Sequence, residues 1–185
     1  SPALVSGKLY AFARQGSDEV LRCFDAATGK ELWQSKYESI AVKGAARSHD
    51  GPRSSPAVAN GKVVVVGIAG FVSCFDANDG TLLWRKDEFP GQHPQYFTSA
   101  SPRIVGDMCI VQLGGKKSGA IIAFDLNDGE ERWRWAGDPP AYASPAFMNH
   151  DGRTQVVALT NTNLVGIDSE EGYLLWQTPF APATM

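Results

Sequence analysis

The sequence predicts an all-β fold made of four four-stranded antiparallel sheets, arranged as the blades of a β-propeller. A motif of the form Asp-x3-Gly-x3-Trp occurs four times, a Ser-Pro pair opens each copy, and the repeats recur every 43 to 54 residues. Periods of this size built from short strands are typical of propeller blades rather than of helical repeats. No segment has sustained apolar residues at spacings of three and four, so we expect no helix of consequence.

The Ser-Pro pairs divide the 185-residue chain into four units, at 1–54, 55–100, 101–143 and 144–185. Four of the five tryptophans occupy the last position of the motif. The motif copies are Asp25, Gly29 and Trp33; Asp76, Gly80 and Trp84; Asp125, Gly129 and Trp133; and Asp168, Gly172 and Trp176.

The second unit has the clearest strand pattern. A short apolar segment at 56–59 precedes Asn60-Gly61, a pair that favours a type I′ hairpin turn because both positions need positive φ. The next segment, 62–66, contains four consecutive valines and predicts a strand buried on both faces. Two further strands at 71–75 and 81–85 complete a four-stranded meander.

The other units follow the same order. Their strands are predicted at 4–5, 8–12 and 20–24 in the first unit, at 109–113 and 120–124 in the third, and at 155–160 and 164–167 in the fourth. In every unit the motif marks the turn that leads into the last strand.

Each motif residue has a structural role in this arrangement. The Asp side chain can accept hydrogen bonds from the backbone amides just ahead of it. The Gly supplies the left-handed conformation that returns the chain. The Trp lies on the next strand, where we expect its ring to cover a neighbouring blade and its indole N–H to find an acceptor.

The motif with its flanking residues resembles the tryptophan-docking repeat of the quinoprotein-like β-propellers, most clearly at 25–33. That family includes the pyrroloquinoline quinone (PQQ) alcohol dehydrogenases, and non-enzymatic relatives such as the propeller lipoprotein of the bacterial outer-membrane barrel-assembly machinery. The resemblance covers essentially the whole chain, and we place the chain in the non-dehydrogenase branch. It implies part of a larger seven- or eight-bladed propeller in a periplasmic or otherwise extracytoplasmic bacterial setting.

The resemblance also implies what a dehydrogenase of this family needs: two adjacent cysteines beside the quinone, a calcium or similar ion, and a catalytic Asp. The three cysteines, Cys23, Cys74 and Cys109, are not adjacent. Cys23 and Cys74 share a repeat position with Ala123 and Gly166, which indicates a small buried slot. We therefore expect no catalytic residue, cofactor or metal in this segment, and PQQ with calcium only under the alternative function below.

Composition and residue spacing argue against three further classes: nucleic-acid binding, membrane spanning and calcium binding. Lys and Arg total 17 against 20 Asp and Glu, a net charge of −3, so no basic stripe exists to pair with nucleic-acid phosphates. The longest apolar stretch is too short to span a bilayer. The Asp-rich turns superficially resemble calcium loops, but the Gly comes one residue early and the Glu at the twelfth position is missing.

Candidate binding residues lie in the longer connections, since function concentrates on loops above a rigid scaffold. We expect the second-to-third and blade-to-blade connections to share one face and to be long, with the tight turns on the opposite face. The candidates on this long-loop face are His49, Asp50, Arg53, His93, Tyr96, Arg103 and Tyr142. The alternative is that these loops only link blades.

Two functions follow from these patterns. The first is a non-catalytic binding or scaffolding module that uses the long-loop face for a protein or peptide partner. The second is part of a PQQ-dependent alcohol or sugar dehydrogenase whose cofactor residues lie outside this segment.

Four blades also leave ring closure open, because an open arc has two apolar end faces. The chain could be a piece of a larger propeller that its remaining blades complete. It could instead be a half-ring that pairs head to tail with a second copy, or a closed four-bladed ring.

Overall fold

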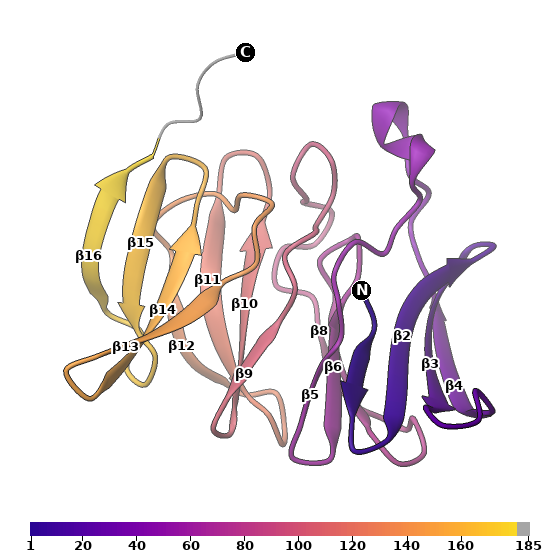
Figure 1. Cartoon of the computed structure of the whole chain (residues 1–185). Coiled ribbons are helices and arrows are strands. Elements are labelled where there is room, and N and C mark those ends of the chain that lie inside the picture. Colours follow the sequence, from indigo (N-terminus) through magenta and orange to yellow (C-terminus); the bar gives the residue numbers. More distant parts are fainter. Residues whose placement is uncertain (181–185) are drawn as a thin grey trace.

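A computed structural model describes residues 1–180 and contains four four-stranded antiparallel sheets (Figure 1). Each sheet is a meander in which consecutive strands pair, so the predicted all-β fold of propeller blades is confirmed. We number the sheets as blades 1 to 4. Blade 1 contains β1 (Ala3–Val5), β2 (Lys8–Gln15), β3 (Asp18–Asp25) and β4 (Glu31–Glu38); blade 2 contains β5 (Ala57–Ala59), β6 (Lys62–Val66), β7 (Val72–Asp76) and β8 (Leu82–Lys86); blade 3 contains β9 (Arg103–Val105), β10 (Met108–Gly114), β11 (Gly119–Asp125) and β12 (Glu131–Trp135); blade 4 contains β13 (Ala146–His150), β14 (Arg153–Leu159), β15 (Asn163–Asp168) and β16 (Leu174–Pro179).

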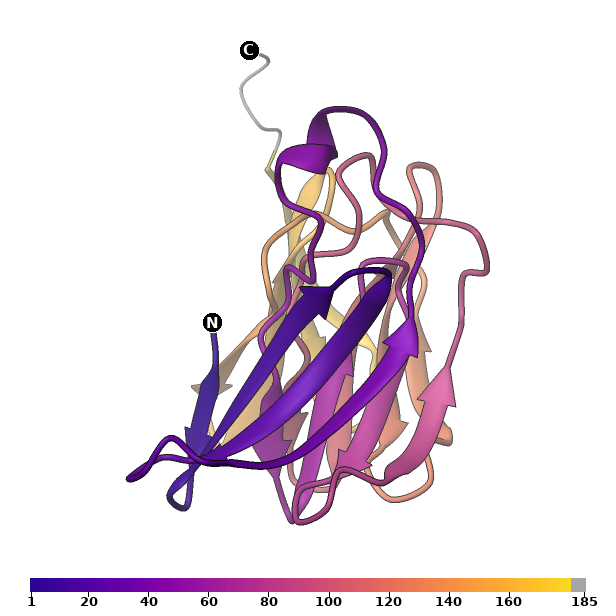
Figure 2. The ribbon, with the colours of Figure 1, turned by 90° about the vertical axis from the view of Figure 1, so that its right-hand side faces the viewer.

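Strand ends differ from the prediction most in blade 1. There β2 and β3 pair without interruption until Gln15 faces Asp18, because the turn between them is only two residues long. One short 3₁₀ helix, η1 (Gly44–Ser48), interrupts the connection from blade 1 to blade 2. It rises above blade 1 on the face opposite the β1–β2 and β3–β4 turns (Figure 2), and Ala46 packs there with Val42, Ile68 and Phe97.

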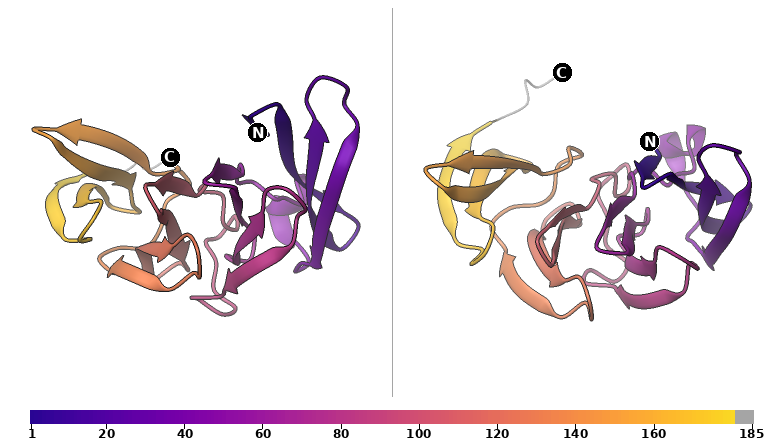
Figure 3. Two further views of the ribbon diagram at one scale, coloured as in Figure 1. Left: turned by 90° about the horizontal axis from the view of Figure 1, so that it is seen from below. Right: turned by 60° about the horizontal axis from the view of Figure 1, so that its bottom comes forward.

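The four blades stand side by side along an open arc, with blades 1 and 4 at its two ends (Figure 3). The first strands of the blades lie along the inner side of the arc, where β1 contacts β5 and β5 contacts β9. By itself, therefore, this chain does not form the closed four-bladed ring that was one of the three alternatives.

The apolar core lies between successive blades. In β6, Val63 and Val65 pack toward blade 1, whereas Val64 and Val66 pack toward blade 3, and none is more than 1% exposed. The prediction that this strand is buried on both faces is therefore confirmed. The turn before it has φ of +50° at Asn60 and +71° at Gly61, as a type I′ hairpin requires.

The motif tryptophans connect neighbouring blades. In blades 1 to 3, the indole N–H donates to a backbone carbonyl of the following blade, at the residue just after that blade's motif Asp. The bonds run from Trp33 to Ala77 (3.3 Å), from Trp84 to Leu126 (3.1 Å) and from Trp133 to Ser169 (3.1 Å).

Trp176, in the last blade, has a different partner. Its indole N–H donates to Oε1 of Gln155 at 2.8 Å, within blade 4 itself. Its ring lies over Gly166, where a Cβ atom would come within 2.2 Å of the indole. The small slot opposite the tryptophan, filled by Cys23, Cys74 and Ala123 in the other blades, is thus occupied by glycine here.

The Ser-Pro landmarks form a second set of links on the inner side of the arc. The nitrogen of Ser1 donates to the hydroxyl of Ser55 at 3.0 Å. In the same way, the backbone N–H of Ser55 donates to Ser101, and that of Ser101 to Ser144, both at 2.8 Å. The start of each blade is therefore hydrogen-bonded to the serine hydroxyl of the next blade, which explains why a serine recurs at this position.

Candidate functional site

The long connections are the three that lead from blade to blade, at 39–56, 87–102 and 136–145. They lie on one face, together with η1 (Figure 1). The expectation that the second-to-third connections are also long is wrong: in every blade these are turns of two to five residues, because the strands pair almost up to the turn. The term long-loop face is kept here for this side of the molecule.

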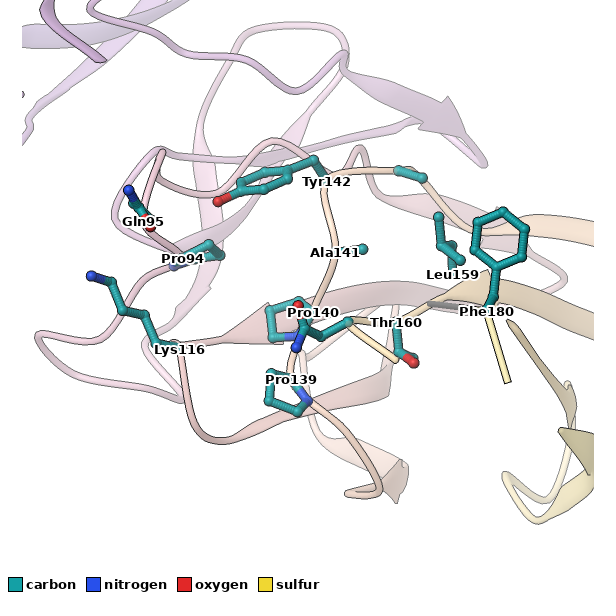
Figure 4. A pocket seen from close by; sticks show the side chains of 13 residues that line it. Pro94, Gln95, Lys116, Pro139, Pro140, Ala141, Tyr142, Leu159, Thr160 and Phe180 are labelled. Atoms are coloured by element: carbon teal, nitrogen blue, oxygen red, sulfur yellow. The ribbon is translucent and has the colours of Figure 1, made fainter. Parts of the chain in front are cut away.

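A pocket of about 690 Å³ opens on the long-loop face between blades 2, 3 and 4 (Figure 4). Five segments of the chain contribute to it: the loops at 87–102 and 136–145, the β10–β11 turn, the end of β14 with the β14–β15 turn, and the residue that follows β16. Its lining consists of Pro94, Gln95, Gly115, Lys116, Pro139, Pro140, Ala141, Tyr142, Ala143, Leu159, Thr160, Asn161 and Phe180.

The walls of the pocket are mainly apolar. Leu159 and Phe180 form one side, and Tyr142 lies across from them (Figure 4). Among the described lining residues, Lys116 carries the only charge, and no carboxylate, histidine or cysteine is present. Such a surface can hold apolar groups and one anionic group, but it offers no acid–base pair for catalysis.

Asp138 fixes the loop that forms the floor of the pocket. Its Oδ2 accepts hydrogen bonds from the hydroxyls of Thr160 (2.5 Å) and Thr162 (2.7 Å), from the Thr162 amide (3.0 Å) and from Nδ2 of Asn163 (3.2 Å). Burial opposes ionisation of this carboxyl, but the hydrogen bonds outweigh it and hold the pKa of Asp138 below its usual value. The blade 3 to blade 4 loop is thereby tied to the β14–β15 turn.

Pro140 is held on both sides. It forms an isolated β-bridge with Thr160. On its other side it packs against Gly119, where a Cβ atom would come within 2.5 Å of the Pro140 ring. Glycine at the start of β11 is therefore needed for this close approach.

Two of the predicted residues meet at the rim of this pocket. The rings of Tyr96 and Tyr142 are 6.0 Å apart, and the Tyr96 amide donates to the Tyr142 hydroxyl at 3.2 Å. The Ser99 hydroxyl donates to the Tyr142 carbonyl at 3.0 Å. Tyr142 itself lines the pocket, and these bonds fix its ring to the loop from blade 2.

His49 and Asp50 lie elsewhere on the same face. They line a separate hollow of about 540 Å³ next to β2 and Gly16. Arg14 donates to the carbonyls of Asp50 (3.3 Å) and Ile40 (3.0 Å) across this hollow. The structure thus separates these two residues from the tyrosine pair.

Arg53 and His93 both pack on Phe97 and stabilise the loops. His93 stacks on the Phe97 ring at 4.2 Å, and the Arg53 guanidinium lies 5.9 Å from the same ring. Arg53 also donates to the carbonyls of His49 (2.6 Å) and Ala46 (3.2 Å), which closes the loop that carries η1. Arg53 thereby joins the blade 1 to blade 2 connection to the blade 2 to blade 3 connection.

Arg103 lies at the start of β9, and its guanidinium is 5.5 Å from the Phe147 ring of blade 4. It lines a hollow of about 400 Å³ beside the Ser-Pro pairs on the inner side of the arc. The seven predicted residues are therefore distributed over four places rather than gathered in one site.

Sequence reasoning missed most of the pocket. Lys116, Asn161 and Phe180 were not predicted, because they lie in the β10–β11 turn, in the β14–β15 turn and after β16, and nothing in their spacing shows that they meet. The adjacent prolines, Pro139 and Pro140, were the one visible signal. Trp135, two residues after the motif Trp133, is the last residue of β12 and precedes the loop that contains them.

The described residues do not fit a PQQ or metal site on their own. PQQ carries three carboxylates, and the pocket offers one cation. The three cysteines are free and buried; burial raises the pKa of the Cys74 thiol to about 12, so it stays protonated. In the described part of the chain, no three His, Cys, Asp or Glu side chains gather to hold a metal ion.

The fold and its repeats define a class of PQQ-like propeller proteins. The chain belongs to the PQQ-like repeat family whose model is described as outer membrane protein assembly factor BamB, which matches residues 17–184.

Similar proteins include quinone-dependent alcohol dehydrogenases. The quinohemoprotein alcohol dehydrogenase of Comamonas testosteroni is 28% identical over 160 residues, covering 83% of this chain and 22% of the enzyme. The dehydrogenase subunit of the quinone alcohol dehydrogenase from Gluconacetobacter polyoxogenes is 30% identical over 168 residues, covering 80% and 22%. The chain thus spans about a fifth of the length of these relatives.

Solved structures agree with the fold. The crystal structure of the Comamonas testosteroni enzyme superposes with a TM-score of 0.74 at 20% identity, covering 98% of this chain and 35% of that one. BamB from Moraxella catarrhalis gives a TM-score of 0.65 at 19% identity, covering 97% and 47%. These similarities show the fold alone.

The comparisons do not support the placement in a non-dehydrogenase branch, because the two sequence relatives at 28–30% identity are dehydrogenases. Cysteine spacing within one segment does not separate the branches when most of each relative lies outside the match. Among the described residues, no helix is both long and apolar enough to cross a membrane.

Proposed function

We propose that this chain is a binding segment of a PQQ-like β-propeller and that it holds a protein or peptide partner in the pocket on the long-loop face. The observation that carries this proposal is the character of that pocket. It is apolar and aromatic, has one cation at Lys116, and has no carboxylate, histidine or cysteine among its described lining residues. Specific binding needs no more than this, whereas acid–base or nucleophilic catalysis does.

The chemistry of the lining limits the partner. Tyr142, Leu159 and Phe180 suit an apolar or aromatic side chain, and Lys116 suits a carboxylate next to it. The hydrogen bonds of Asp138 and the contact between Tyr96 and Tyr142 hold the walls before a partner arrives, which lowers the entropy cost of binding. The partner expected from this chemistry is an extended segment with an acidic residue beside one or two apolar residues.

We also propose a periplasmic or otherwise extracytoplasmic location. The family description, an outer membrane protein assembly factor, supports this setting. Detection of the full-length protein in fractionated cells, in the osmotic-shock or envelope fraction rather than the cytoplasm, would test it.

Peptide selection with matched variants tests the binding function. A random peptide library displayed on phage is selected against the wild-type chain, and the enriched peptides are measured by fluorescence anisotropy. Tyr142→Ala and Lys116→Glu should each weaken binding about tenfold or more, as expected for an aromatic anchor and a charge contact. Lys117→Glu is the control, because Lys117 is the exposed neighbour of Lys116 and does not line the pocket.

Two results would contradict the binding proposal. One is that no peptide is enriched over a library selected against an unrelated protein. The other is that Lys117→Glu weakens binding as much as Lys116→Glu, which would indicate general attraction to a basic turn rather than a pocket.

A second function, part of a PQQ-dependent alcohol or sugar dehydrogenase, is favoured by the relatives at 28–30% identity. In this case the cofactor residues would lie outside this segment, since the residues present do not form that site. The full-length protein, loaded with PQQ and calcium, is assayed for reduction of an artificial electron acceptor with a series of alcohols. Turnover would establish the enzyme; absence of PQQ binding would eliminate it.

A further inference from the structure

We propose that Phe97 is a positioning residue for the pocket on the long-loop face, and that the blade 1 to blade 2 connection at 39–56 acts on that pocket through the Phe97 ring. This inference rests on the proposed function, because affinity for a partner is the property that Phe97 would change. Three features support it: the backbone conformation of Phe97, the groups that pack on its ring, and its position in the loop that forms one wall of the pocket.

The backbone of Phe97 is held in a conformation that its residue type disfavours. Its φ is +65°, in the left-handed region where a bulky residue is rarely found. Two hydrogen bonds flank it: the Phe97 amide donates to the Pro94 carbonyl at 3.0 Å, and the Thr98 amide donates to the Ile68 carbonyl at 3.1 Å. Such a conformation persists only where the surrounding structure over-determines it. The contacts of the ring therefore contribute to holding this part of the loop.

The Phe97 ring joins two connections that are far apart in the sequence. It is 5% exposed, and the His93 ring stacks on it with 4.2 Å between centroids and 15° between planes. The Arg53 guanidinium, from the 39–56 connection, lies 5.9 Å from the centre of the same ring. The other members of this apolar cluster are Val42, Ala46 and Ile68. The placement of the 39–56 connection is thereby coupled to that of the 87–102 loop.

The 87–102 loop also forms a wall of the pocket. Pro94 and Gln95 line it, on the side toward which the Tyr142 ring points (Figure 4). The Pro94 carbonyl accepts the Phe97 amide and also accepts a hydrogen bond from Nδ1 of His93 at 2.8 Å, so this wall residue is bonded to both stacked residues. Among the described residues, none of the 39–56 connection lines the pocket, and that connection reaches the pocket by way of Phe97.

Tyr96 links the Phe97 backbone to the aromatic side chain of the pocket. Its amide donates to the Tyr142 hydroxyl at 3.2 Å, and the two tyrosine rings are 6.0 Å apart. Because Tyr96 directly precedes Phe97, a shift of the Phe97 ring would turn this amide away from Tyr142. The alternative is that Phe97 only fills space between the loops, in which case its loss would lower stability and leave affinity unchanged.

Matched substitutions separate these two roles. Phe97→Leu keeps an apolar side chain but removes the stacking face, and it should weaken binding of peptides selected on the wild-type chain about five- to tenfold. Phe75→Leu is the control, because Phe75 is 2% exposed and packs in a cluster between blades 1 and 2 that contains no residue of the 87–102 loop. It should lower stability and leave affinity unchanged. Fluorescence anisotropy is measured at a temperature at which circular dichroism shows every variant to be folded.

Further variants test whether the ring transmits the effect. His93→Phe and His93→Ala both lose the bond to the Pro94 carbonyl, but only His93→Phe can still stack on Phe97. His93→Phe should therefore retain more affinity than His93→Ala. Arg53→Met should weaken binding by itself and add little to Phe97→Leu, because both changes act on one contact. Full additivity of Arg53→Met and Phe97→Leu would overturn transmission through the ring.

A measurement without any peptide distinguishes failure of this inference from failure of the proposed function. Hydrogen exchange of the Tyr96 amide, followed by NMR, should be faster in Phe97→Leu and Arg53→Met than in wild type and unchanged in Phe75→Leu, because its bond to Tyr142 depends on Phe97. Unchanged exchange in Phe97→Leu would overturn the positioning role, as would unchanged affinity of that variant for peptides that bind wild type. Faster exchange together with a failure to enrich any peptide would overturn the proposed function alone.

Discussion

The motif glycines fulfil two requirements at once. Gly80, Gly129 and Gly172 have φ between +74° and +77°, a region that disfavours every residue with a Cβ atom. The same three glycines also lie directly under a tryptophan of the preceding blade. The turn and the inter-blade contact therefore depend on one residue type for separate reasons.

These two requirements can be separated by substitution. Gly29→Ala should cost about 1–2 kcal/mol, the penalty for a left-handed alanine, because nothing described lies near its Cβ position. Gly129→Ala should cost about 1–3 kcal/mol more, because its Cβ would come within 2.7 Å of the Trp84 ring. Urea unfolding measures how much free energy of unfolding each variant loses. Equal losses in the two variants would contradict the double role.

The Asp138 carboxylate should make stability depend on pH in the acidic range. Its pKa is lowered in the folded state, so its contribution is complete above the unfolded value of about 3.9 and is lost as the pH falls through the folded pKa. Wild type should therefore exceed Asp138→Asn in stability at neutral pH, and the difference should shrink below about pH 4. Urea unfolding of wild type and Asp138→Asn is measured from pH 7 to pH 2. If the difference between their unfolding midpoints stayed constant over this range, the prediction would be wrong.

At the scale of elements, each blade depends on the next. A sheet of this kind has apolar side chains on both faces, and the tryptophan, the Ser-Pro hydroxyl and the valine strand all contact a neighbouring sheet. Blades 2 and 3 have a neighbour on each side, whereas blades 1 and 4 have one. Equivalent residues should thus contribute unequally to stability.

Truncation of two equivalent tryptophans tests this inequality. Trp84→Ala should cost about 3–5 kcal/mol, as expected for a buried large aromatic side chain. Trp176→Ala should cost clearly less, because its indole N–H bonds within its own blade and its ring lies over Gly166 of the same sheet. Thermal or urea unfolding of dilute protein compares them. A loss below about 1 kcal/mol at Trp84 would refute the inter-blade contact as a source of stability.

At the scale of the whole molecule, the arc is a one-dimensional stack in which each blade contacts only its neighbours. Stability in such a stack is approximately the sum of the blades and the contacts between them, and opening starts at the ends. The three apolar clusters between blades fit this description.

Hydrogen exchange should show that backbone amides of the central blades exchange more slowly than those of the end blades. In dilute protein, amides of β6, β7, β10 and β11 should exchange slowest, and those of β2, β3, β14 and β15 faster, because the latter blades are covered on one face only. Mass spectrometry of peptic fragments measures the exchange rate of each strand. Uniform protection across the four blades would contradict the stack.

Most of the fold could be predicted because its determinants are local. The Asn60-Gly61 turn, the valine strand 62–66 and the four Asp-x3-Gly turns each specify their own geometry through φ preferences and short hydrogen bonds. The errors lie where pairing continues past the local signal, as at β2 and β3, and where the connections between second and third strands are shorter than expected.

Little of the candidate site could be predicted, because its residues meet only through the stacking of blades. Lys116, Tyr142 and Phe180 come from three separate connections, and nothing in their spacing shows that they converge. His49 and His93 were chosen for their chemistry, yet one lines a separate hollow and the other stacks on Phe97.

The blade, its strands and the number of repeats can be derived from the amino-acid sequence, since they follow from turn chemistry and from apolar periodicity within each repeat. The stacking of the blades, which no single repeat specifies, determines which loops enclose a pocket. The physical reason is that a repeated signal specifies each unit identically, whereas position in the stack makes the units differ. Trp84 and Trp176 share one motif, but in the described part of the chain Trp84 donates to the following blade and Trp176 to its own sheet.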